Sequence, residues 1–186
     1  MSKTESSMLA LGTRAPEFAL RDTVSDRMIQ FGDIAGTHGT LVMFICNHCP
    51  FVKHVIDELV TLGQDYLERG IGMVAISSND VTGYPQDRPE RMKELAREMG
   101  FGFPYLHDET QETARAYSAT CTPDFFVFDA SRSLVYRGQL DDSRPGNGIP
   151  VTGRDLRAAF DALLAGENVS GNQKPSIGCN IKWKDS

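Results

Sequence analysis

The sequence lacks several features that define large classes of protein. No segment approaches 18 consecutive apolar residues, the length at which a run is read as a membrane-spanning helix. There is no long run of like charges, and the formal net charge of −6 argues against a nucleic-acid surface. Residues 1–8 are polar and lack the apolar stretch of a secretory signal. We therefore expect a cytoplasmic protein whose partners include neither nucleic acid nor a membrane.

Cysteine is also scarce. The chain has only four cysteines, too few for a secreted domain built on a disulfide scaffold. Two of them, Cys46 and Cys49, are separated by just two residues, whereas Cys121 and Cys179 each stand alone. In a reducing compartment such a close pair is typical of a catalytic or a metal-binding site.

The remaining composition is ordinary for a globular protein. The chain has 186 residues, of which 40% are hydrophobic and 24% are charged. This length predicts one domain over residues 1–186, with a core large enough to fold unaided. Within that domain we expect a loose leader over residues 1–12 and an irregular tail over residues 167–186.

A strand, a helix and a second strand are predicted around the cysteine pair. Residues 39–45 form a continuous apolar run, which is typical of a strand buried on both faces. From Phe51 the apolar residues recur at helical spacing until Gly70, and residues 71–76 form another buried-strand candidate. This order predicts a βαβ unit with two parallel strands.

Further elements follow the same alternation. The sequence predicts a β-hairpin over 18–31, helices over 87–99, 109–118 and 152–164, and a second hairpin formed by 124–128 and 134–136. Thr152 is a candidate N-cap for the last helix. The fold class is therefore α/β, with a central sheet flanked by helices.

The chemistry is expected where the first buried strand ends. Cys46 and Cys49 lie between that strand and the helix, at the edge where α/β folds place ligands. Helix N-termini and Cys-x-x-Cys pairs lower the pKa of cysteine from about 8.5 to roughly 3.5–7.5, which produces the reactive thiolate. Pro50 suits the first helical turn and favours Cys49 as the N-cap residue. Either cysteine remains a candidate for the attacking thiol.

His48, Cys121 and Cys179 each have a functional and a structural interpretation. His48 is a candidate for tuning the thiolate, or a polar loop residue. Cys121 is either an additional redox thiol or a small buried hydrophobic residue. Cys179 is either an additional redox thiol or an inert thiol in the tail. A metal site would draw on Cys46, Cys49, Cys121 and either His48 or His54. Structural zinc sites usually have a second close ligand pair, which this sequence lacks, so no metal ligand is predicted.

Three segments carry a family resemblance: Cys46-Asn47-His48-Cys49-Pro50-Phe51-Val52-Lys53, Thr122-Pro123-Asp124-Phe125-Phe126 and Ser176-Ile177-Gly178-Cys179-Asn180-Ile181-Lys182-Trp183. Together they resemble the peroxiredoxin-like group of the thioredoxin-like superfamily, also described as alkyl hydroperoxide reductase/thiol-specific antioxidant family proteins or thiol–disulfide isomerases. The resemblance runs from about residue 12 to the end of the sequence. It implies a thioredoxin-like fold, a central mixed sheet with an N-terminal β-hairpin extension.

The resemblance also implies roles for particular residues. It makes Cys46 and Cys49 the redox pair, and Pro123 a cis proline that faces them. In the superfamily the backbone beside that proline receives extended peptide substrates, which implies substrate binding at Thr122 and Pro123. Peroxiredoxins carry a threonine three residues before the peroxidatic cysteine, whereas here Met43 precedes Cys46 at that distance.

Three functions remain open at this point. The leading one is a thiol–disulfide oxidoreductase that reduces or exchanges disulfides through Cys46 and Cys49. The second is a thiol-dependent peroxidase, an antioxidant enzyme of peroxiredoxin type. For both we expect a disulfide or peroxide substrate, a thiol electron donor such as thioredoxin or glutathione, and no cofactor. The third, of a different class, is a non-catalytic zinc-binding or regulatory protein.

Overall fold

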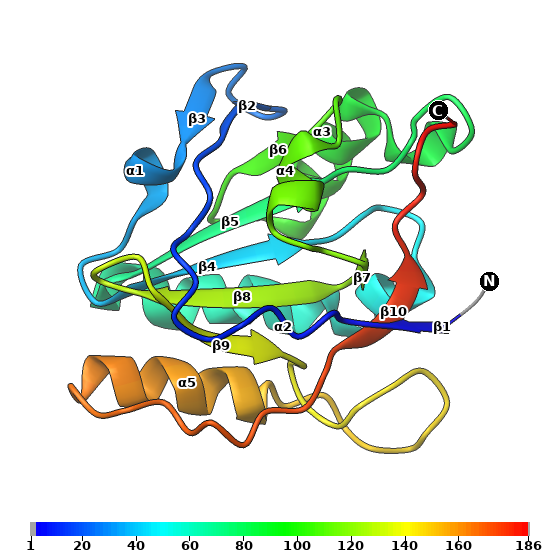
Figure 1. Ribbon diagram of the computed structural model, residues 1–186. Helices are drawn as coiled ribbons and strands as arrows, with labels where there is room; N and C mark the ends of the chain where they lie inside the picture. The colour runs from blue at the N-terminus through cyan, green and yellow to red at the C-terminus, as the bar shows by residue number, and fades with distance from the viewer. Residues whose placement is uncertain (1–2, 186) are drawn as a thin grey trace.

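The buried run that begins at Gly39 forms the central strand of a seven-stranded mixed sheet. In the computed structural model, which describes residues 3–185, β4 (Gly39–Phe44) is fully buried. It pairs in parallel with β5 (Ile71–Ser77) and antiparallel with β8 (Asp124–Asp129). The sheet has the order β3-β2-β6-β5-β4-β8-β9 (Figure 1). The βαβ unit predicted around the cysteine pair is confirmed by the parallel pairing of β4 and β5.

The other elements follow in chain order along the sequence. The strands are β1 (Lys3–Glu5), β2 (Ala19–Asp22), β3 (Met28–Gln30), β6 (Tyr105–His107), β7 (Cys121–Thr122), β9 (Leu134–Gly138) and β10 (Ile177–Asn180). The helices are α1 (Phe31–Ile34), α2 (Pro50–Tyr66), α3 (Pro89–Met99), α4 (Glu112–Ala116) and α5 (Arg154–Leu164), with short 3-10 turns η1 (Leu67–Arg69) and η2 (Pro85–Asp87). Within residues 3–185, none of the helices has both the length and the apolar character to cross a membrane.

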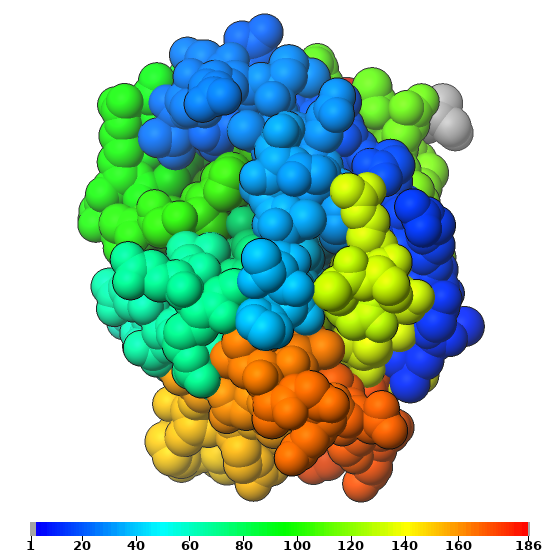
Figure 2. Space-filling view, turned by 90° about the vertical axis from the view of Figure 1, so that its left-hand side faces the viewer, coloured from blue at the N-terminus to red at the C-terminus, as the bar shows by residue number. Residues whose placement is uncertain are grey.

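The two faces of the sheet have separate cores. Side chains alternate along β4, so that Leu41 and Met43 pack on one face and Val42 and Phe44 on the other. Apolar residues of α2, α3 and α5 cover the first face, and α1 and α4 contribute apolar residues to the core on the second. Figure 2 shows the segment from the hairpin to α1 at one end of a side face and α5 at the other. This arrangement confirms the α/β class and the N-terminal hairpin.

The expected loose leader and irregular tail are wrong over part of their length. Residues 3–5 form β1 and residues 177–180 form β10, and these strands join β7 in a second antiparallel sheet of order β1-β10-β7. The register places Cys179 opposite both Lys3 and Thr122. Strands of three or four residues with partly exposed side chains show no apolar alternation, because backbone pairing rather than a hydrophobic face holds them in place. Residues 1, 2 and 186 lie outside the described residues.

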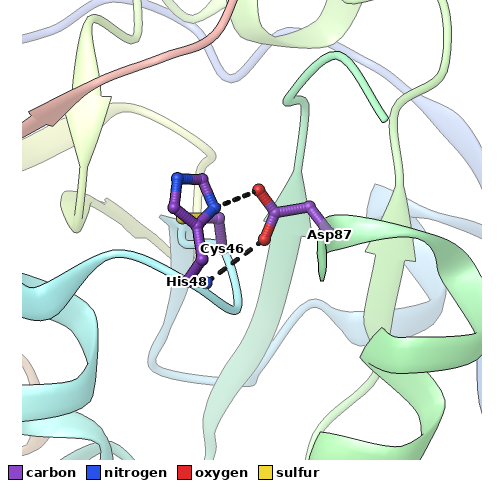
Figure 3. Close-up of side chains that lie close together, drawn as sticks. All are labelled: Cys46, His48 and Asp87. Atoms are coloured by element: carbon purple, nitrogen blue, oxygen red, sulfur yellow. Dashed lines mark hydrogen bonds and ion pairs between the residues drawn. The ribbon is translucent and has the colours of Figure 1, made fainter. Parts of the chain in front are cut away.

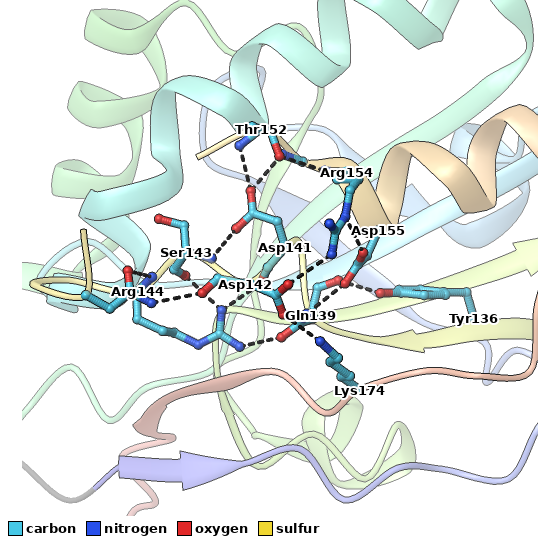
Figure 4. Close-up of polar contacts among 12 residues, drawn as sticks. Tyr136, Gln139, Asp141, Asp142, Ser143, Arg144, Thr152, Arg154, Asp155 and Lys174 are labelled. Atoms are coloured by element: carbon cyan, nitrogen blue, oxygen red, sulfur yellow. Dashed lines mark hydrogen bonds and ion pairs between the residues drawn. The ribbon is translucent and has the colours of Figure 1, made fainter. Parts of the chain in front are cut away.

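The last helix begins two residues later than predicted, at Arg154, with Gly153 rather than Thr152 at its N-cap. The cause is the buried carboxylate of Asp141, which accepts the backbone N–H groups of both Thr152 and Gly153 at 2.7 Å (Figure 4). Gly153 has φ +68°, and a Cβ there would lie 2.3 Å from Oε1 of Glu58. The acidic loop after β9 therefore fixes the start of α5.

A pH-dependent stability follows from Asp124, the first residue of β8. Its side chain is fully buried, and burial raises its pKa to about 7, whereas an unfolded aspartate titrates near 3.9. The native state therefore holds a proton that the unfolded chain releases, so this group costs stability progressively as pH rises from about 4 to about 7. We expect Asp124→Asn to raise the free energy of unfolding by on the order of 2 to 4 kcal/mol at pH 7.5 and by little at pH 4.

Urea unfolding of both proteins under reducing conditions, at pH 4 and pH 7.5, measures this difference. Asp57→Asn is the matched control, since Asp57 is an exposed carboxylate on α2. A gain from Asp124→Asn that is equal at the two pH values would contradict the prediction.

Candidate active site

The cysteine pair lies where β4 ends and α2 begins. Cys49 is the N-cap residue of α2, with extended backbone angles, and Pro50 occupies the first helical position. This confirms the N-cap position predicted from Pro50. Both side chains are buried, with 1% of Cys46 and none of Cys49 exposed. The first turn of α2 directs its unpaired N–H groups toward this end of the helix, which favours a negative charge there.

A second chain segment brings Thr122 against both sulfurs. The Thr122–Pro123 peptide bond is cis, as the resemblance implies. The Thr122 hydroxyl lies 3.5 Å from Sγ of Cys46, and its carbonyl oxygen lies 3.3 Å from Sγ of Cys49. Thr122 is therefore in contact with both cysteines of the pair. Its backbone is also paired with β10, so that edge of β7 is already occupied by the chain's own strand.

The two solitary cysteines lie in different places. A hydrogen bond joins Sγ of Cys179 to Sγ of Cys49 at 2.8 Å. The thiol of Cys121 instead contacts the carbonyl oxygen of Pro123 at 3.6 Å. Neighbouring residues of a strand point to opposite sides, and the register sets Cys179 opposite Thr122 rather than opposite Cys121. Of the two candidate additional thiols, the structure brings only Cys179 to the pair.

Cys49 is the sulfur whose negative charge the site stabilises. A hydrogen bond from the Cys46 thiol is the largest cause that lowers the pKa of Cys49, to about 4, and the Cys179 thiol, Thr122 and the Val52 N–H act in the same direction against the effect of burial. The same hydrogen bond raises the pKa of Cys46, and burial and the Asp87 carboxylate raise it further. Burial and the Cys49 sulfur raise the pKa of Cys179 to about 12. The three sulfurs thus share one negative charge, centred on Cys49.

The residue that sequence reasoning missed is Asp87. Its carboxylate is completely buried and accepts hydrogen bonds from Nδ1 of His48 at 2.6 Å and from the backbone N–H groups of Asn47 at 2.8 Å and His48 at 3.3 Å (Figure 3). Nδ2 of Asn79 donates to it at 2.9 Å. Asp87 therefore fixes the two residues between the cysteines. No signal marks it in the sequence, because it lies 40 residues from Asn47.

Aromatic contacts hold the same loop from the outside. The Tyr84 ring stacks on the His48 ring, with centroids 5.3 Å apart and planes at 12°. The hydroxyl of Tyr105 donates to Oδ1 of Asn47 at 2.9 Å. His48, predicted to tune the site, is thus held between Asp87 and Tyr84, and its Nε2 is buried with no hydrogen-bond partner among the described residues.

The residues that could hold a metal differ from those suggested by the sequence. Cys46, His48 and Asp87 each offer one ligand atom, and these atoms lie within 4.8 Å of one another. His54 is directed elsewhere, with its Nε2 bonded to Oγ of Ser143 at 2.7 Å. Cys121 lies against Pro123, so the four-ligand set considered from the sequence is not assembled.

Solved structures share this architecture over the whole chain. A conserved protein from Geobacillus kaustophilus is 58% identical, with a TM-score of 0.99, and the match covers 100% of this chain and 98% of that one. A hypothetical protein from Sinorhizobium meliloti 1021 is 48% identical, with a TM-score of 0.96 over 98% of this chain and 100% of that one.

A more distant likeness shows the fold alone. The thioredoxin domain of a thiol-disulfide oxidoreductase from Bacteroides vulgatus is 18% identical, with a TM-score of 0.59 over 69% of this chain and 88% of that one. This likeness and the sheet order establish the thioredoxin-like fold.

A search of curated proteins finds no match. The sequence model of the AhpC/TSA family matches residues 11–137, which include β4, the cysteine pair, the start of α2 and the cis Thr122–Pro123 bond. A match over this share of the sequence decides the family: the chain belongs to the AhpC/TSA family.

Proposed function

We propose that the protein is a thiol–disulfide oxidoreductase that uses Cys46 and Cys49 as its dithiol. Membership of the AhpC/TSA family supports a redox function in general. The observation that carries the specific proposal is that Thr122 contacts both sulfurs at the start of α2, where Cys49 is the N-cap residue. Two cysteines separated by two residues at a helix start can close a disulfide, and the helix start favours the thiolate that begins the exchange.

We assign the attack to Cys49, because it holds the stabilised charge. Its thiolate displaces one sulfur of a substrate disulfide and forms a mixed disulfide. Cys46 then attacks Sγ of Cys49, the substrate leaves as its second thiol, and a Cys46–Cys49 disulfide remains for a thiol donor such as thioredoxin or glutathione to reduce. Cys46 must lose its proton in that second step. The imidazole of His48, held by Asp87 beside Cys46, is placed to receive it.

Reversible closure of the pair is the first expected outcome. When the protein is equilibrated with glutathione buffers of increasing oxidation and then alkylated, its mass should show two thiols titrating together. Cys121→Ser should titrate like the wild type, since that thiol lies apart, whereas Cys46→Ser and Cys49→Ser should lose the Cys46–Cys49 bond. A pair that stays reduced across the series excludes the proposal.

A metal analysis of the purified protein tests the metal-binding alternative. A zinc content of one ion per chain that mild oxidant does not release would favour a site formed by Cys46, His48 and Asp87.

The order of attack and its pH dependence form the second expected outcome. With oxidised glutathione, Cys46→Ser/Cys179→Ala should accumulate a mixed disulfide on Cys49, and Cys49→Ser/Cys179→Ala should not; Cys179 is removed because its sulfur contacts Cys49. Because the pKa of Cys49 is lowered to about 4, the initial rate of adduct formation should change little between pH 8 and pH 6. A thiol with a pKa near 8.5 loses on the order of 100-fold of its thiolate over that range. Trapping on Cys46 instead, with the steep pH profile, would reverse the assignment.

One contact favours the thiol-peroxidase alternative enough to test it. The Thr122 hydroxyl lies 3.5 Å from Sγ of Cys46, so a hydroxyl is present beside this sulfur although Met43 occupies the position three residues before it. A peroxidase would consume hydrogen peroxide with a thiol donor through a sulfenic acid. We expect consumption close to that of a Cys46→Ser/Cys49→Ser control. Turnover well above that control, lost on Thr122→Val, would make the peroxidase the better description.

A further inference from the structure

The C-terminal strand β10 lies directly against the cysteine pair. Figure 1 shows β10 crossing beside the start of α2 and next to β7. Its register with β7 sets Cys179 opposite Thr122, the residue whose side chain and carbonyl contact the two active-site sulfurs. Cys179 is thereby held 2.8 Å, sulfur to sulfur, from Cys49. A disulfide bond is about 2.05 Å long, so bonding requires these atoms to approach by less than about 1 Å.

Several contacts fix this strand in place. A Cβ on Gly178 would lie 1.9 Å from the Thr122 carbonyl oxygen, so the strand approaches β7 as closely as only glycine permits. The hydroxyl of Ser176 donates to the Pro123 carbonyl at 2.6 Å, before the strand. The backbone N–H of Lys182 donates to Oδ1 of Asn79 at 2.9 Å, after it. The position of Cys179 is therefore built into the fold on both sides of the residue.

We propose that Cys179 is a third redox thiol that exchanges with the Cys46–Cys49 disulfide and ties β10 covalently to the start of α2. This inference rests on the proposed dithiol function of Cys46 and Cys49. Sγ of Cys179 attacks Sγ of Cys49, a Cys49–Cys179 bond forms, and the Cys46–Cys49 bond breaks. The electron pair of the broken bond goes to Cys46, which takes up the proton that Cys179 loses. One disulfide replaces another, so the step needs no external oxidant or reductant.

The same attack acts on a substrate bound to Cys49. When Cys49 carries a mixed disulfide, Cys179 forms the Cys49–Cys179 bond and the substrate leaves as a thiol with the proton from Cys179. Cys49 interacts with both Cys46 and Cys179, so it is shared by the two possible disulfides.

Oxidation of Cys49 itself prepares Cys179 to attack. Burial is the largest cause that keeps the pKa of Cys179 high, followed by the hydrogen bond and the charge of the Cys49 sulfur. Those last two effects vanish once Cys49 is bonded to another sulfur. The Lys182 ammonium and the Phe51 N–H, both of which lower the pKa of Cys179, remain. The Cys179 thiolate therefore becomes more accessible in the state that offers it a disulfide to attack.

Peptide mapping tests the exchange directly. Trypsin cleaves after Arg27 and Lys53, so Cys46 and Cys49 share one peptide, while Cys179 and Cys121 fall in two others. The full-length Cys46→Ser variant is freed of metal with a chelator, treated with one equivalent of oxidised glutathione and alkylated. We expect the Cys49 peptide to be linked to the Cys179 peptide within one chain. In Cys46→Ser/Cys121→Ala the same link should form, since Cys121 lies apart.

The rate of glutathione release gives an independent measurement. Cys46→Ser should lose its Cys49 adduct roughly ten-fold or more faster than Cys46→Ser/Cys179→Ala, because a thiol in contact with its target acts at a high effective concentration. Equal adduct lifetimes, with no Cys49–Cys179 peptide in Cys46→Ser, overturn the inference. The absence of that peptide decides the matter even if the double variant folds poorly. Failure of the dithiol proposal is distinguishable, since it appears in the wild type as a Cys46–Cys49 pair that never closes.

Discussion

The site depends on one constraint, which is that a single buried negative charge must be stabilised at Sγ of Cys49. Buried thiolates are costly unless hydrogen bonds or dipoles compensate for lost water. Here the N-terminus of α2 and the thiols of Cys46 and Cys179 provide that compensation together. Like charges at such short separation repel, so the same contacts keep the other two thiols protonated. The same contacts therefore lower the pKa of Cys49 and raise the pKa values of Cys46 and Cys179.

This electrostatic arrangement requires the loop between the cysteines to be rigid. The Asp87 carboxylate, bound by the backbone of Asn47 and the ring of His48, supplies that rigidity from η2. Asp87 also raises the pKa of Cys46 through its charge, and so helps to determine which cysteine carries the thiolate. One buried carboxylate thus positions the loop and biases the pair at the same time.

The sequence identifies the parts of this site that rest on local physics. Continuous apolar runs and helical spacing predict the βαβ unit, and Pro50 predicts the N-cap at Cys49, because each depends on neighbouring residues. Asp87 and β10 depend on contacts across 40 and more than 50 residues respectively, which spacing does not encode. The two short strands β1 and β10 bury little apolar surface, so their sequences carry no periodic signal. The motif around Cys179 marked the tail as relevant, but only the register of β10 with β7 shows which sulfur it meets.

The position of β10 also explains how chemistry at the pair can alter the protein beyond the pair. β10 connects β7 with β1, so a change in its bonding reaches the segment at residues 3–5. Closing any disulfide at Cys49 removes the one charge of the centre and with it the interaction that held the Cys179 proton. The covalent state of Cys49 and the attachment of β10 are therefore linked through the same sulfur atom. In the mechanism that we propose, the strand that occupies the edge of β7 is itself a redox element, because its only cysteine lies in contact with Sγ of Cys49.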